Sequence, residues 1–178
     1  MMKLKTPVLV LLSVVAFVLM SCEDKKSTEK TTAEKLVGVW YADASVGSLG
    51  NTTASSGSLA GAGWTTYQLT LNADGSFAVE GANGYDIAPY GDGDGIINYS
   101  GTYTIDDTQD PMWIDLTCTA SDNVFFTTAD SLQPMQPGIF ELDQAGLELT
   151  IQYGAKAYAI PRPSAFLDAP GPGSLVKQ

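Results

Sequence analysis

The chain has 178 residues, 44% of them hydrophobic, and a formal net charge of −11 at pH 7. Its length suits one domain, and its acidity disfavours nucleic acid, whose binding needs cationic contacts to phosphate. No histidine is present, which excludes histidine-based catalytic triads and most zinc sites.

The first 21 residues have the pattern of a secretory signal peptide. Lys3 and Lys5 precede an apolar run over 8–20 that only Ser13 interrupts. The run is shorter than the roughly 20 residues that span a bilayer, and its length and flanks are typical of a signal peptide. The small residue Ser21 directly precedes Cys22. We therefore expect cleavage before Cys22, and loss of the two lysines takes the net charge from −11 to −13.

Residues 22–35 are polar, charged and free of aromatic side chains. Such a segment buries too little apolar surface to fold alone, so we expect a flexible tether. The remaining residues, 36–178, form the expected domain, and Lys156, Arg162 and Lys177 are its only cations.

Short stretches of alternating apolar and polar residues dominate the domain and predict half-buried β-strands. The expected strands are 36–41, a hairpin over 64–80, 97–105, 112–118, 139–142 and 147–153, with shorter candidates at 124–126 and 157–160. Turn residues such as Asn72-Ala73-Asp74-Gly75 separate them. No amphipathic helix is evident, and the pattern predicts an all-β domain, either an up-and-down barrel or a sandwich.

Two loops stand out by composition. Residues 47–63 are rich in Gly, Ser, Thr and Ala and indicate a flexible insertion or a mobile lid. Residues 81–95 contain Asp86, Asp92 and Asp94, whose oxygens are of the kind that binds Ca²⁺. Because the other EF-hand ligands and the flanking helices are missing, a solvated acidic turn is the simpler interpretation, and no metal site is assigned.

Cys118 alternates with Met112, Ile114 and Leu116. We expect a buried, unpaired small hydrophobic residue here, with a reactive thiol as the alternative.

Two motifs near the leader resemble those of bacterial lipoproteins. Leu19-x-Ser21-Cys22 resembles a lipobox, which implies acylation of Cys22 and anchoring in a membrane. The Glu23-Asp24 pair that follows resembles the surface-export signal of Bacteroidota lipoproteins. The resemblance implies a cell-envelope protein, in the outer membrane and exposed at the cell surface.

The domain itself resembles the small lipocalin-like domains of unknown function that are abundant in planctomycetes. The matching pieces are Leu36-x-Gly38-x-Trp40, Gly101-Thr102-Tyr103, Ile114-Asp115-Leu116-Thr117, Gly138-Ile139-Phe140-Glu141-Leu142 and Arg162-Pro163-x-x-Phe166. The resemblance implies an eight-stranded barrel, closed at one end by Arg162 stacked on Trp40, and assigns no activity. The loop 47–63 and the segment 119–137 are longer than usual for the family, and the last strand, near Leu175-Val176, is truncated.

Three functions follow as hypotheses. The first is a binder of a small apolar ligand inside the barrel, where the lining would be Tyr67, Phe77, Tyr99, Tyr103, Trp113 and Tyr153. The second is a protein-interaction or inhibitory module that acts through its loops. The third, an enzyme built on Asp106, Asp107 and Asp115, is disfavoured because turn positions explain these residues. We expect a monomer without a cofactor.

Overall fold

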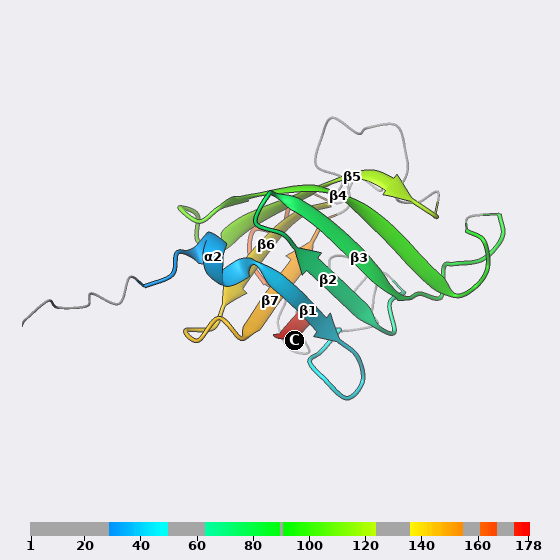
Figure 1. Ribbon diagram of the computed structural model, residues 1–178, viewed down its shortest axis with the longest axis horizontal. Helices are drawn as coiled ribbons and strands as arrows, with labels where there is room; N and C mark the ends of the chain where they lie inside the picture. The colour runs from blue at the N-terminus through cyan, green and yellow to red at the C-terminus, as the bar shows by residue number, and fades with distance from the viewer. Residues whose placement is uncertain (1–28, 50–62, 90, 124–135, 155–160, 167–172) are drawn as a thin grey trace, which may run out of the picture.

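The computed structural model describes residues 29–49, 63–89, 91–123, 136–154, 161–166 and 173–178. Cys22, the signal peptide and the candidate strands at 124–126 and 157–160 lie outside them, as does most of the 47–63 loop. Within the described residues the fold is a closed antiparallel barrel in which each strand pairs with the next and β8 returns to β1 (Figure 1). The strands are β1 Gly38–Ala42, β2 Tyr67–Leu71, β3 Ser76–Ala82, β4 Ile96–Asp106, β5 Met112–Ser121, β6 Gln136–Leu142, β7 Glu148–Tyr153 and β8 Gly173–Lys177.

The predicted up-and-down barrel is therefore confirmed. Period-two burial produces it: in β2 the apolar residues Tyr67, Leu69 and Leu71 are buried, while the polar residues between them are half-buried. Inward-facing apolar residues of all eight strands form one core. The predicted turn after β2 is also present, with Gly75 at φ 83° and its N–H donating to the Asn72 carbonyl at 3.1 Å.

One short helix precedes the barrel and corrects the expected extent of the tether. Helix α2 spans Thr32–Leu36, so it covers the end of the tether predicted over 22–35 and the first residue of the strand predicted over 36–41. The Thr31 side chain accepts the Glu34 backbone N–H while the Glu34 carboxylate accepts the Thr31 N–H, a capping box that stabilises a helix start. Leu36 is buried in the core, so the folded unit begins at this helix.

The barrel has two different ends (Figure 1). The helix end carries α2 and the tight turns 72–75, 107–111 and 143–147. The loop end carries the longer connections, including residues 43–49 and 83–95. Since α2 leads into β1 at the helix end, the N-terminal segment joins the barrel opposite the loop between β3 and β4.

Trp40 closes the helix end. It is fully buried, and its indole Nε1 donates to the Leu36 carbonyl at 2.7 Å. Lys177 pairs with Trp40 across β1 and β8. The Lys177 ammonium lies 4.9 Å from the indole centroid and donates to the Lys35 carbonyl at 2.6 Å. Gly38 makes room for it, because a Cβ there would lie 2.7 Å from Lys177 Cε.

The expected stacking of Arg162 on Trp40 is wrong. Arg162 lies 4.5 Å over the ring of Trp113, on the outer face of β5. Its guanidinium donates to the Gly138 carbonyl at 2.6 Å and forms an ion pair with Asp115. An aromatic ring, a carbonyl and a carboxylate thus hold Arg162 outside the barrel, whereas the register of β1 and β8 brings Lys177 to Trp40.

We predict that Lys177→Met lowers the free energy of unfolding by about 1 kcal/mol, because methionine keeps the stem over Trp40 but loses the cation–π contact and the hydrogen bond. Denaturant unfolding measures the change. Lys35→Met is the matched control: it removes a lysine side chain but keeps the carbonyl that accepts from Lys177. Equal effects of the two variants would contradict this account of the helix end.

Aspartates organise several turns and predict acid sensitivity. Backbone and side-chain hydrogen bonds from Ser45 lower the pKa of Asp43 to about 2. Turn hydrogen bonds also lower the pKa values of Asp74, Asp106 and Asp143. A depressed folded-state pKa contributes stability above the unfolded pKa, near 3.9, and this stability is lost as pH falls through the folded value.

We therefore expect the thermal midpoint to fall as pH is lowered from about 5 to about 2. Asp43→Asn keeps an acceptor oxygen but does not titrate, so it should flatten part of that slope. Circular dichroism melts across the range provide the measurement, and a midpoint independent of pH would refute the role given to these turns.

Candidate functional site

Four of the six predicted ligand-lining residues lie together inside the barrel. Tyr67, Phe77, Tyr99 and Tyr153 are each at most 5% exposed. The Phe77 and Tyr99 rings meet edge to face with centroids 5.8 Å apart. Trp64, which the ligand hypothesis did not include, packs edge to face on Tyr67 at 5.1 Å. Trp64 lies just before β2, so this aromatic group fills the barrel toward the loop end.

The hydroxyl groups of this cluster form a short chain. The Tyr99 hydroxyl donates to Gln136 Oε1 at 2.9 Å and lies 3.2 Å from the Tyr67 hydroxyl. Because the Tyr99 hydroxyl donates its hydrogen to Gln136, it accepts a hydrogen bond from the Tyr67 hydroxyl. Burial raises the pKa of Tyr67 to about 12 and raises the pKa values of Tyr99 and Tyr153 well above their usual range. The phenols are therefore neutral donors at physiological pH and not proton-transfer groups.

The Tyr153 hydroxyl differs from its neighbours. It is buried and has no hydrogen-bond partner of normal geometry in the described part of the chain, although the Tyr67 hydroxyl is near enough to raise its pKa. A buried donor without a partner is costly. Among the predicted lining residues within the described part of the chain, Tyr153 is the one that we identify with a buried, unsatisfied hydroxyl group.

The other two predicted lining residues lie elsewhere. Tyr103 is half-buried, and its hydroxyl donates to the Asn72 carbonyl at the β2–β3 turn. Trp113 is 38% exposed and faces outward beneath Arg162. Because Ile114 and Leu116 point inward, the period of β5 places Trp113 on the outer face, so it does not line the interior.

The interior is filled by side chains. Trp40, Tyr67, Leu69 and Ile97 have no exposed surface, and Phe77 is only 2% exposed. A cavity large enough for a small ligand would leave its lining accessible to a small probe. Eight-stranded barrels have interiors that side chains can fill or that hold one small ligand, and the described core is of the filled kind.

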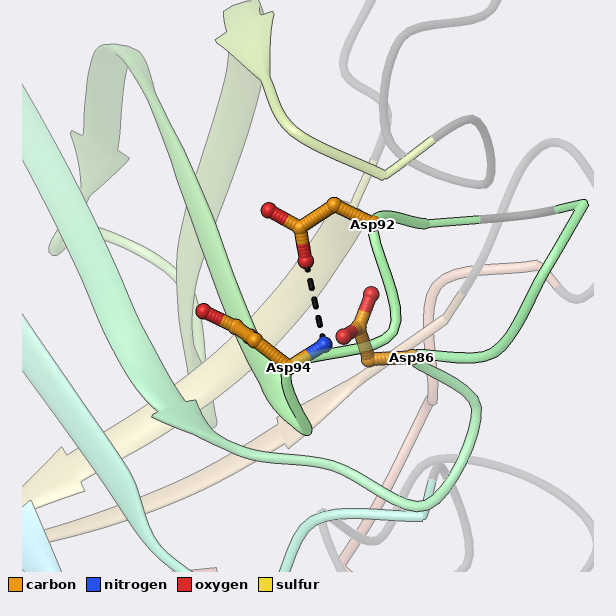
Figure 2. Close-up of side chains that lie close together, drawn as sticks. All are labelled: Asp86, Asp92 and Asp94. Atoms are coloured by element: carbon orange, nitrogen blue, oxygen red, sulfur yellow. Dashed lines mark hydrogen bonds between the residues drawn. The ribbon is translucent and has the colours of Figure 1, made fainter.

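The loop between β3 and β4 gathers three carboxylates at the loop end. One oxygen each of Asp86, Asp92 and Asp94 lies within 4.8 Å of the others, and Figure 2 shows the three side chains converging. Asp86 is only 4% exposed and accepts the Gly95 N–H at 2.8 Å. Asp92 accepts the Asp94 N–H at 3.2 Å, and Asp94 accepts the Ile96 N–H at 2.7 Å.

The structure therefore brings the three predicted carboxylates together, and it adds the burial of Asp86, which sequence alone did not indicate. Carboxylate oxygens suit Ca²⁺, but that ion takes six to eight oxygen ligands. Each aspartate already accepts a backbone N–H of its own loop. The cluster is thus explained as a set of turn-forming aspartates, and no metal function is assigned to it.

The same loop exposes two large apolar side chains. Tyr85 is 52% exposed and Ile87 is 53% exposed. Val46, in the β1–β2 connection at the same end, is 36% exposed. Little in the sequence indicated that Tyr85 and Ile87 are exposed. They flank the buried Asp86 in a polar loop, and outside a strand the alternation of residues does not predict which side chains face the solvent.

The remaining candidate residues have structural partners. Asp106 accepts the Thr108 N–H in a turn, and Asp115 pairs with Arg162. Cys118 is unpaired and buried as predicted, its thiol donates to the Ala120 carbonyl at 3.3 Å, and burial raises its pKa. A raised pKa disfavours the reactive thiolate.

Comparisons with models of protein families, with curated proteins and with solved structures found no match. None of the described helices has the length and apolar character needed to cross a bilayer.

The hydroxyl chain predicts opposite outcomes for two similar substitutions. Tyr99→Phe leaves the Gln136 oxygen without its donor and should cost about 1–2 kcal/mol of unfolding free energy. Tyr153→Phe removes a hydroxyl that has no such bond and should change stability by less than about 0.5 kcal/mol, or raise it. Denaturant unfolding measures both, and a larger loss for Tyr153→Phe would show that its hydroxyl has a stabilising partner.

Proposed function

We propose that the chain is a lipid-anchored protein of the bacterial cell envelope, whose barrel is a non-catalytic module that binds another protein through its loop end. The Leu19-x-Ser21-Cys22 motif supports the anchor. The lipocalin-like resemblance is consistent with the closed barrel. The observation that carries the binding role is the pair of exposed apolar side chains, Tyr85 and Ile87, above a filled interior.

The filled interior favours the protein-binding hypothesis over the ligand-binding one. Tyr99 contacts the rings of Phe77 and Trp64, and Trp64 also contacts Tyr67. An apolar ligand would therefore have to displace packed aromatic side chains. Displacing such a core costs several kcal/mol before any contact with the ligand is gained. Exposed apolar residues at the loop end need no such rearrangement, because a partner protein can cover them where they are.

The position of α2 supports the same arrangement. The lipid on Cys22 would precede the helix, and α2 enters the barrel at the helix end. The loop end is then the part of the domain most remote from the point of attachment. A module held in this way presents Tyr85 and Ile87 away from the membrane.

The test uses the lipidated full-length protein in its own host membrane. A photo-reactive residue at position 87 should give a discrete cross-linked product with a second protein, because Ile87 would be in the contact, and Tyr85→Ser should reduce that product several-fold. Leu147 is the matched control, since it is 58% exposed but lies in a turn at the helix end.

A photo-reactive residue at position 147 should give no such product. Equal products from both positions, or none from position 87, would contradict the proposed contact. Cys22→Ser tests the anchor separately: it should release the protein from the membrane without changing the fold.

A further inference from the structure

The outer face of β2, β3, β4 and β5 contains a hollow of about 430 Å³, called here the outer trough. Its floor is a row of small side chains in register across the four strands, namely Thr70, Ala78, Ser100 and Ala120. A shift in register between Ser100 and Gly101 interrupts the β4–β5 ladder beside it. Irregularities of this kind increase the local bend of a sheet, and this one lies beside Ser100 on the lining of the hollow.

A second row of polar side chains borders the trough toward the loop end. Gln68, Glu80 and Asn98 are paired across β2, β3 and β4. Asp122 follows β5, and its carboxylate accepts from the Asn98 backbone N–H at 2.9 Å and from the Asn98 amide at 2.9 Å. These contacts fix the position of one carboxylate, while Glu80 is exposed beside it.

Neither carboxylate has an ion-pair partner among the residues that the structure describes. Two of the three cations of the domain are committed elsewhere: Arg162 to Asp115, and Lys177 to the Lys35 carbonyl. The trough thus offers two carboxylates, two side-chain amides and several hydroxyl groups, which together accept hydrogen bonds from a cationic group.

The trough also adjoins the proposed contact surface. Glu80 lies near the end of β3 and Asn98 near the start of β4, and the loop that connects these strands carries Tyr85 and Ile87. A partner that covers the apolar pair is therefore well placed to reach the carboxylates.

We infer that the outer trough binds lysine or arginine side chains of the partner protein, next to apolar residues that cover Tyr85 and Ile87. This inference rests on the proposed function and specifies the partner's contact segment: basic and apolar side chains lie side by side in it. Charge complementarity of this kind steers association and selects partners more than it adds affinity.

The test uses the full-length chain in detergent and a fluorescent tri-arginine peptide as the probe, with tri-citrulline as its neutral counterpart. Glu80→Gln should weaken tri-arginine binding about threefold, and the double variant with Asp122→Asn about tenfold, because exposed ion pairs each contribute modestly. Asparagine at 122 keeps an acceptor for the Asn98 N–H. Glu141→Gln removes the same charge from an exposed position on β6, away from the trough, and should have almost no effect.

If Glu141→Gln weakened tri-arginine binding as much as Glu80→Gln, the binding would depend only on the overall negative charge of the protein, and the inference would be overturned. Tri-citrulline binding as tightly as tri-arginine, or maltotriose binding in the trough instead, would also overturn it. Cross-linking from position 87 distinguishes failure of the trough inference from failure of the proposed loop-end contact. If the cross-linked product persists in the Glu80→Gln/Asp122→Asn variant, the trough inference fails while the loop-end contact stands.

Discussion

Closing an eight-stranded sheet on itself leaves an interior of roughly one layer of side chains, and the rest of this structure depends on how that space is filled. Trp40 fills the helix end, the Tyr67–Tyr99 pair fills the region toward the loops, and aliphatic residues occupy the space between them. The indole of Trp40 links three separate elements, because it bonds to the carbonyl of Leu36 and lies beneath Lys177. The helix, the first strand and the last strand are thereby fixed together.

Because the core is filled, we propose that recognition takes place on the outside of the molecule. Strands of a closed barrel have no free edge to pair with another chain, and the interior has no room for a guest without repacking. The surfaces that remain are the loops and the outer face. In this chain the loop end carries exposed apolar residues, and the adjacent outer face is hollow and acidic. The domain thus combines a filled barrel with surface features that suit the proposed protein-binding role.

Much of the fold was predictable from local pattern. Alternation in stretches such as Tyr67–Leu71 defines both the strand and its inward face, and Asp74-Gly75 defines the turn after it. The capping box at Thr31 and Glu34 was also readable, although the charged composition of the segment concealed it. Closure by Lys177 was not predictable, because it depends on the register between strands more than 130 residues apart, and local sequence does not encode that register.

The site was predictable only in part, for related reasons. Tyr67, Tyr99 and Tyr153 were placed correctly inside, but hydrophobic pattern does not reveal whether an interior is hollow or packed. The prediction that Trp113 lines the interior is wrong, because Trp113 alternates with the inward-facing Ile114 and so lies on the outer face of β5. The outer trough arises from small residues on four strands that meet only through register, so no single segment of the sequence indicates it.

We propose that recognition occurs outside a filled barrel interior. The most direct measurement is a titration of the full-length, isotope-labelled chain with a medium-chain fatty acid, followed by NMR of the inward-facing aromatic residues. A filled barrel predicts that the signals of Trp40, Tyr67 and Tyr153 do not shift as the fatty acid is added. Saturable shifts confined to these inward-facing residues would show that the interior admits an apolar ligand and would contradict the claim.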